Sequence, residues 1–361
     1  MRGGPRRRRD ISMLFGLHIH HPAHLSIWIA PDDQRVVPRI KVTVDGVTTV
    51  SSANEVDHNL KSWGWHSTGL CAFNLHDGAF PGLSEAALLE VRDYDTNILL
   101  YRRSRELGDT QRRVLFLDHT IGQASPLRDT LFSKFQISHL MLKGVSQPVL
   151  NCIIGNQFLN SLFCYGPIFY PVCESFLIEH KFLKIFLAHD PYLELARRIF
   201  WLRRVSELAV SSARHWQIEE IVDACYFASS LDFSDLPLLK KSFRNLDAKT
   251  TNTLSNPMTR YLGARDEREA LNPGHWSTAI QNLSRFEVVG HHDYAGEFSA
   301  SVMQALDLPY EEPVPRPGPR QEVRDAAEML RAVRNAAPLV EMDLDLSERI
   351  RSLVEKYWKQ A

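Results

Sequence analysis

The first hundred residues alternate between apolar and polar positions in short stretches that turn residues separate. This pattern is typical of β-strands that bury one face. RIKVTVDGVTTV (39–50) places an Asp-Gly pair between two β-branched runs, which predicts a hairpin. ALLEVRDYDTNILLYRR (87–103) predicts a second hairpin around its DYDTN turn. We therefore expect a small β-sandwich over residues 13–103.

Residues 114–361 show a different pattern. VLFLDHT, KIFLA and FEVVG are continuous apolar runs, as in strands that are buried on both faces of a parallel sheet. Helix-like segments, LRDTLFSKF and PYLELARRIFWLRR, follow the first two runs. Alternating strands and helices predict an α/β fold with a mostly parallel sheet flanked by helices.

Polar and proline-rich segments separate these parts. Residues 1–12, which contain RRRR, predict a disordered basic tail, and residues 104–113 predict a linker. The proline-rich segment 309–321 is expected to be extended. After it, EVRDAAEMLRAV and DLSERIRSLVEKYWKQ predict two amphipathic helices that dock on the body of the protein.

Composition excludes several classes of function. A net charge of -1 over 361 residues gives no general basic surface for a nucleic acid. The most apolar segment, 149–178, is interrupted by Asn, Gln, Glu, Gly and Pro, so we expect no transmembrane segment. No apolar run of a secretory signal follows the arginines. Five cysteines without a CxxC pair are typical of a reduced, cytoplasmic protein.

Two strand-to-helix loops carry candidate chemistry. LDHTIGQASPLRD (117–129) is either a plain turn or a phosphate cradle made by backbone N–H groups near Gly122 and Ser125, with His119 and Thr120 beside them. LAHDPYLELARRIFWLRR (187–204) places His189, Asp190 and a proline at the start of a helix. Its arginines, Arg197, Arg198, Arg203 and Arg204, form either a solvated face or a set of phosphate donors.

Two histidine clusters raise the question of a metal. His18 and His20 share one face of an expected strand, and VVGHHDYAGEF contains His291, His292 and Asp293. Neither cluster has a cysteine ligand nearby. We interpret the first cluster as ordinary strand and turn residues, and the second as the turn that ends the last core strand. No metal is expected.

Several segments together resemble the carbohydrate-type sulfotransferases. HTIGQAS (119–125) and HDPYLELARRI (189–199) lie at the spacing of that family's PKTGGTS-like and RDPVERFLSAY-like segments. NPMTRYLGARD (256–266) is similar to its NxQTRYLxG segment, and AIQNLSRFEVVGHHDYAGEFSASVMQALDLP (279–309) is similar to its NL-x-x-F-x-x-VG-LTERFDES segment. The resemblance covers about the last 250 residues.

This resemblance implies a P-loop NTPase-like domain that uses 3'-phosphoadenosine 5'-phosphosulfate as co-substrate and a carbohydrate as acceptor. His119 would act in catalysis, and His139 is a candidate general base. The residues that would bind the co-substrate are His119, Thr120, Gly122, Gln123, Ala124, Ser125, His189, Arg197 and Arg260.

The sequence also departs from the family pattern. His119 replaces the loop lysine, Gln123 and Ala124 replace hydroxyl residues, His189 replaces an arginine and Arg197 replaces a serine. Two hypotheses follow. One is a sulfotransferase that acts on a bacterial surface or capsular polysaccharide. The other is a catalytically degenerate carbohydrate-binding or scaffold protein of the same pathway. A metal-dependent hydrolase is a weaker third hypothesis.

Overall fold

The computed structural model describes residues 13–104, 110–121, 125–140, 142–157, 159–211, 221–244, 246–313 and 318–358. The expected basic tail and half of the expected linker lie outside these ranges. The chain divides into two compact units. The first contains the described residues up to Val114, together with Leu131–Tyr165 and Ser175–Phe182, and the second contains Leu115–Thr130, Gly166–Glu174 and the chain from Leu183 onward.

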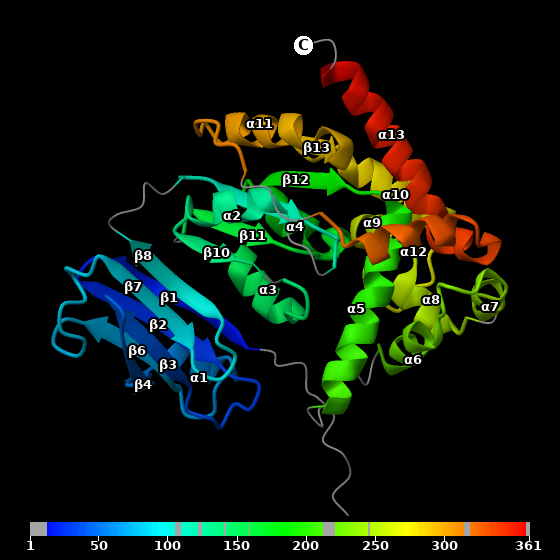
Figure 1. Ribbon diagram of the computed structural model, residues 1–361. Coiled ribbons are helices and arrows are strands. Elements are labelled where there is room, and N and C mark those ends of the chain that lie inside the picture. Colours follow the sequence, from blue (N-terminus) through cyan, green and yellow to red (C-terminus); the bar gives the residue numbers. More distant parts are fainter. Residues whose placement is uncertain are drawn as a thin grey trace, which may run out of the picture. The chain divides into compact units, whose positions relative to one another are not determined.

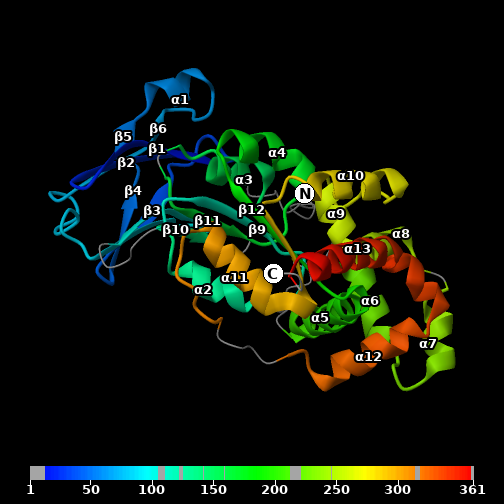
Figure 2. The same ribbon diagram turned by 90° about the horizontal axis from the view of Figure 1, so that it is seen from above.

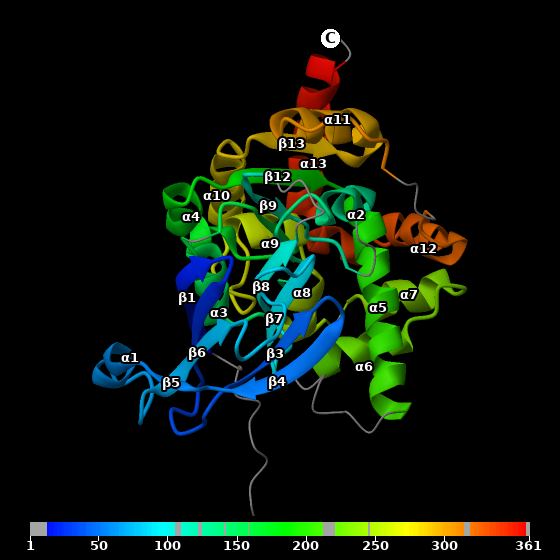
Figure 3. The same cartoon turned by 90° about the vertical axis from the view of Figure 1, so that its left-hand side faces the viewer.

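The first unit contains two four-stranded antiparallel sheets, with strand orders β1-β2-β6-β5 and β4-β3-β7-β8 (Figures 1 and 3). Alternate residues are buried, as at Leu89 and Val91, because each sheet turns one face toward the core. Their strands are β1 Leu14–His21, β2 His24–Ala30, β3 Arg39–Val44, β4 Val47–Ser52, β5 Glu55–Val56, β6 Leu70–His76, β7 Leu88–Asp93 and β8 Leu99–Ser104.

Both predicted hairpins are confirmed. Asp45 and Gly46 connect β3 to β4 with φ angles of 47° and 86°. Two positive φ angles define the turn that matches the twist of a hairpin, and glycine adopts one without strain. The second hairpin pairs β7 with β8, and Asn97 has a φ of 59° in its turn. The residues with positive φ angles in the two turns therefore account for both hairpins.

A five-stranded parallel sheet is the central element of the α/β part, as the apolar runs predicted. Its strand order is β10-β11-β9-β12-β13. The strands are β9 Arg113–Leu117, β10 Ile137–His139, β11 Leu162–Tyr165, β12 Leu183–Ala188 and β13 Val288–His291. Residues 114–117 of β9 and 185–188 of β12 are all buried, which explains their uninterrupted apolar pattern.

Helices account for most of the remaining described chain. The short ones are α1 His58–Ser62, α2 Pro126–Phe132, α3 Gln147–Ile154, α4 Tyr170–Glu179, α6 Val222–Ser230, α7 Leu236–Ser242, α8 Ala248–Leu254 and α9 Pro257–Gly263. The others are α5 Pro191–Ser211, α10 Pro273–Leu283, α11 Ala295–Ala305, α12 Gln321–Arg331 and α13 Glu341–Trp358. None of the helices in the described ranges is long and apolar enough to cross a bilayer.

The two predicted C-terminal helices dock on the second unit, as expected. α12 packs against α5 (Figure 2) and buries Val323 and Leu330 in an apolar cluster to which α5 contributes. α13 contacts β13, and so does α11 (Figure 1). Buried Asp343 at the start of α13 accepts the backbone N–H groups of Met258 and Thr259 at 2.8 Å each. A side chain from the tail therefore caps α9.

Candidate functional site

Strand order places two loops at a topological switch point. β9 lies in the middle of the sheet; the chain next visits β10 and β11 on one side of it and then crosses to β12 on the other. Ligands of parallel sheets bind at the carboxyl ends of strands at such a point, because the two loops there lead away from each other. These loops carry His119 and His189, whose ring centroids lie 5.5 Å apart. The structure thus brings the two sequence-predicted loops together.

Carboxylates occupy the described half of the predicted phosphate cradle. Asp118 Oδ1 accepts hydrogen bonds from the backbone N–H of Thr120 at 2.8 Å and from its hydroxyl at 2.7 Å. The N–H of Ile121 donates to Glu194 Oε1 at 3.2 Å. Gly122, Gln123 and Ala124 lie outside the described residues, and buried Ser125 precedes α2. Acidic side chains therefore shape the first half of this loop.

Arg198 is a buried connection between α5 and this loop. Its Nε donates to Glu194 Oε1 at 2.9 Å, and its Nη2 donates to the carbonyl of His119 at 2.7 Å. Glu194 and Arg198 are 1% and 5% exposed. Of the two sequence interpretations, the solvated face is therefore wrong for Arg198. Its guanidinium group is directed into the protein, where its hydrogen bonds hold the loop in place.

Glu194 has an unusual protonation equilibrium. Burial raises the pKa of its carboxyl group to about 7, because desolvation disfavours the charged form more than Arg198 and Arg197 favour it. Its Oε2 has no hydrogen-bond partner among the described residues and lies 4.0 Å from Nη1 of Arg197. The carboxyl group is thus poised to change its charge near neutral pH.

Arg197 is the cation of α5 that lies beside the histidines. Its side chain is 12% exposed, and its Nε is buried without a hydrogen-bond partner in the described part of the chain. Its charge contributes to lowering the pKa of both His119 and His189. Arg197 therefore retains hydrogen-bonding capacity that Arg198 does not.

Four imidazoles form a row across the carboxyl ends of β9, β12 and β13. The ring of His189 contacts that of His119 and stacks on that of His292 at 5.9 Å, and His292 lies 4.4 Å from His291. Burial lowers the pKa of all four residues, to about 4 for His291. The row is therefore neutral at pH 7.

His119 cannot supply the charge of the lysine that it replaces. It is 1% exposed, and burial together with Arg198 and Arg197 lowers its pKa well below the ordinary value. Its ring stacks on Phe186 of β12, and its Nδ1 has no hydrogen-bond partner among the described residues. It can offer a ligand one neutral hydrogen bond, but less charge than an unperturbed histidine.

Several buried polar atoms in this region lack a partner within the described chain. They are His119 Nδ1, Glu194 Oε2, Arg197 Nε and His292 Nδ1. Buried polar groups in folded proteins nearly always have a hydrogen-bond partner, and a group that lacks one indicates a bound molecule, a water or a functional role. Their common location marks the switch point as the candidate binding site.

Helix capping explains part of the HDP motif. Asp190 Oδ1 accepts the N–H groups of Tyr192 and Leu193 at 2.9 and 3.1 Å, and its other oxygen accepts a hydrogen bond from Arg331. Pro191 occupies the first helical position, where a missing N–H costs nothing. The aspartate and the proline therefore start α5, and His189 alone is left for ligand contact.

Arg260 makes hydrogen bonds to the protein itself. Its Nη1 donates to the carbonyls of Glu267 and Glu269 at 3.1 and 2.9 Å, and its Nη2 donates to the Ser255 hydroxyl at 3.3 Å. The side chain is buried in α9. These contacts position the loop before α10, and the Nε of Arg260 is buried without a hydrogen-bond partner among the described residues.

His139 and His18 belong to the first unit. His139 ends β10, and burial lowers its pKa to about 4, with a smaller effect of Arg92. A histidine with this pKa is a weak general base, which counts against the catalytic role that the sequence suggested. His18 Nε2 pairs with Asp57 at 2.6 Å, and the side chain of His20 lies outside the described set.

The last histidine cluster forms the predicted strand-end turn. β13 ends at His291, a 3₁₀ turn covers His292–Tyr294, and α11 begins at Ala295. The turn nevertheless gathers two imidazoles and the carboxylate of Asp293, whose ligand atoms all lie within 4.8 Å of one another. The turn interpretation is confirmed, and the chemistry of the cluster is a separate question.

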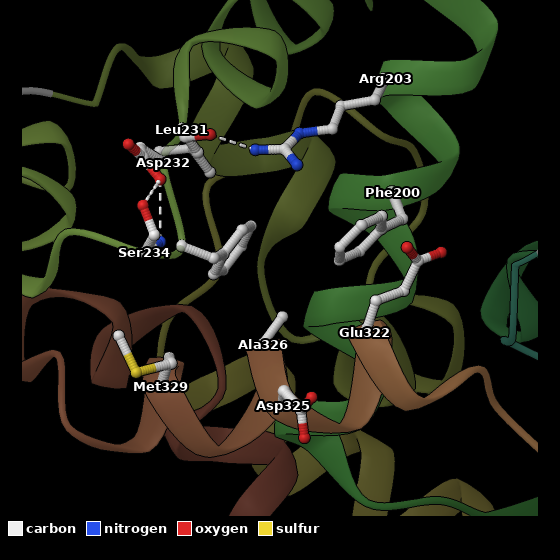
Figure 4. Close-up of a pocket in the computed structure, with 10 residues that line it drawn as sticks. Phe200, Arg203, Leu231, Asp232, Ser234, Glu322, Asp325, Ala326 and Met329 are labelled. Atoms are coloured by element: carbon white, nitrogen blue, oxygen red, sulfur yellow. Dashed lines mark hydrogen bonds between the residues drawn. The ribbon is translucent and has the colours of Figure 1, made fainter.

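The second unit also has a hollow of about 410 Å³ between α5 and α12, away from the switch point (Figure 4). Arg203 lies in it against the rings of Phe200 and Phe233, and its Nε donates to the carbonyl of Ala228 at 2.7 Å. It also donates to the carbonyl of Leu231. These contacts fix the end of α6, so the described contacts of Arg203 are structural.

Sequence reasoning missed two residues of the site, Glu194 and Asp118. Glu194 lies four positions before Arg198, the spacing at which a helix pairs two side chains, so a signal for the pair was present. Nothing in the sequence showed that both side chains are buried. Comparison of the chain with known protein families, with curated proteins and with solved structures found no match.

Proposed function

We propose that the second unit binds 3'-phosphoadenosine 5'-phosphosulfate at the carboxyl ends of β9 and β12, and that the protein transfers the sulfuryl group to a hydroxyl of a bacterial surface or capsular polysaccharide. The observation that carries this proposal is the group of buried, unpartnered polar atoms at the switch point. The sequence resemblance to sulfotransferases falls on the same two loops. A phosphorylated co-substrate could accept a hydrogen bond from Arg197 Nε and from imidazole nitrogens that carry a proton.

In this proposal each residue has a limited task. Arg197 binds an anionic oxygen of the co-substrate, and Thr120 and Ser125 lie on the loop that would surround the phosphosulfate. His119 donates a neutral hydrogen bond to charge that develops on the leaving oxygen. His189 lies at the switch point beside His119, so it is closer to the proposed co-substrate than His139 and is the candidate to accept the proton of the acceptor hydroxyl, although burial also lowers its pKa well below the ordinary value.

The catalytically degenerate alternative has its own supporting observation. Glu194 and Asp118 already accept the N–H groups of Ile121 and Thr120, which a phosphate would otherwise use. Glu194 also pairs with Arg198. A loop stabilised by carboxylates repels an anion when both are charged. The protein would then bind carbohydrate or a partner protein without transferring a sulfuryl group.

Calorimetry with adenosine 3',5'-bisphosphate tests the proposal. We expect micromolar binding by the full chain, and more than ten-fold weaker binding by Arg197→Gln, because a charge-assisted hydrogen bond contributes about 1.5–3 kcal/mol. Arg204→Gln is the matched control, since Arg204 is exposed on the same helix. Absence of heat at millimolar nucleotide, or equal losses in both variants, would contradict the proposal and favour the degenerate alternative.

A further inference from the structure

The turn after β13 holds two imidazoles against one carboxylate. His291 Nδ1 lies 3.3 Å from Asp293 Oδ2, and His292 Nε2 lies 3.2 Å from Asp293 Oδ1. The side chains of His292 and Asp293 are 32% and 45% exposed, whereas that of His291 is 4% exposed. The group therefore has one fixed member and two that can adjust toward a ligand.

The hydrogen bonds around His291 determine where its proton lies. Ser347 donates its hydroxyl proton to the carbonyl of His189 at 3.3 Å. Its oxygen, 3.1 Å from His291 Nε2, must then accept a proton from that nitrogen. In the neutral ring Nδ1 consequently carries a lone pair. The backbone N–H of Asp293, which donates to Nδ1 at 3.3 Å, agrees with this tautomer.

This tautomer directs a lone pair of His291 toward a carboxylate oxygen of Asp293. Two acceptors at 3.3 Å repel each other unless a positive group lies between them. A weak backbone hydrogen bond at the side of the ring does not remove that repulsion. A cation bound jointly by the imidazole and the carboxylate would.

The atom types are those of a zinc site, and two of the separations are close to those of one. Zinc binds histidine nitrogen at about 2.0–2.1 Å and carboxylate oxygen at about 2.0–2.2 Å, so two ligand atoms of a tetrahedral site lie about 3.3–3.5 Å apart. The two contacts of Asp293, at 3.3 Å from Oδ2 and 3.2 Å from Oδ1, are close to this separation, and the ligand atoms as a set lie within 4.8 Å of one another, so the half-exposed side chains would have to close slightly around the ion. Ser347 supplies the second hydrogen bond that orients a metal-binding histidine.

We propose that His291 Nδ1, His292 Nε2 and the carboxylate of Asp293 bind a divalent cation of the zinc type, with a fourth position open to solvent. The site requires no nucleotide. It adjoins the proposed co-substrate site, because His292 stacks on His189, but zinc binding in the absence of nucleotide is measured separately from sulfuryl transfer.

Zinc titration of the metal-free full chain, in competition with a chromophoric chelator, tests this site. We expect one zinc per chain with a dissociation constant in the micromolar range or below. His292→Ala and Asp293→Ala should each weaken binding at least ten-fold. Ser347→Ala should weaken it about ten-fold, because loss of an orienting partner typically costs 10- to 100-fold.

His18→Ala is the control, because it removes a histidine from the other cluster that the sequence contains. Its affinity should equal that of the wild type. Circular dichroism of each variant separates a loss of ligand from a loss of fold. The proposal is overturned if the wild type shows no saturable binding at 100-fold excess of zinc over the chain, or if folded His292→Ala and Asp293→Ala bind zinc as tightly as the wild type.

Discussion

At the residue scale, burial decides the roles of the charged side chains in the candidate site. Arg198 and Glu194 occur in a helix whose sequence reads as partly solvated, yet both are almost completely buried. A buried ion pair is strongly destabilised when one partner is lost, because the other charge then stays buried and unpaired. Tertiary packing, which periodicity does not describe, decides what these residues do.

The protonation of Glu194 leads to a prediction about pH. Its pKa rises to about 7 in the folded protein from an ordinary value of 4.5, so the folded state holds this proton more tightly than the unfolded state. The contribution of Glu194 to stability is therefore complete below pH 4.5 and is lost as the pH rises to 7. Glu194→Gln cannot titrate and lacks this loss.

We expect the free energy of unfolding of the wild type, relative to that of Glu194→Gln, to fall by on the order of 1–3 kcal/mol between pH 4.5 and 7.5, since one pKa unit corresponds to about 1.4 kcal/mol. Urea denaturation of both proteins at several pH values measures the difference. Parallel stability curves, or a wild type that becomes more stable relative to Glu194→Gln as the pH rises, would show that the carboxyl group is not held protonated.

At the element scale, α9 depends on the C-terminal helix. The residue before α9, Asn256, has a left-handed conformation with φ 42° and makes no side-chain cap. Asp343 accepts two of the free N–H groups of α9 in its place, and also the hydroxyl of Thr259. Loss of an acceptor for buried donors costs about 1–3 kcal/mol per donor left unsatisfied.

Asp343→Ala should therefore lower the free energy of unfolding by about 2–5 kcal/mol, since more than one donor loses its acceptor. Asp345→Ala is the control, because Asp345 is half exposed and, among the described residues, pairs with Arg349 along the same helix. It should change stability by less than about 0.5 kcal/mol. Equal effects of the two substitutions in chemical denaturation would show that the capping contact is unimportant.

The elements that the sequence predicted are those with strong local signals. The Asp-Gly hairpin, the buried strands β9 and β12, the helix α5 and the two terminal helices are all present. β10 was missed because it has only three residues, and β11 because its LFCY run lies in a segment without a clear period.

At the scale of the whole molecule, strand order determines where the candidate site lies. Sequence predicted a mostly parallel sheet and two loops, but only the order β10-β11-β9-β12-β13 brings the loops of β9 and β12 to one switch point. The row of histidines depends on contacts between segments that are 70 to about 170 residues apart. The i,i+4 spacing of Glu194 and Arg198 is visible in the sequence, but the burial of the pair is not.

Hydrogen exchange of the full chain, with and without saturating adenosine 3',5'-bisphosphate, tests the central claim that an anionic nucleotide binds at the switch point. The account predicts slower amide exchange in peptides covering residues 117–121 and 189–199, and unchanged exchange in the hairpin of residues 39–50. Unchanged exchange in both loops, or protection confined to other segments, would contradict it.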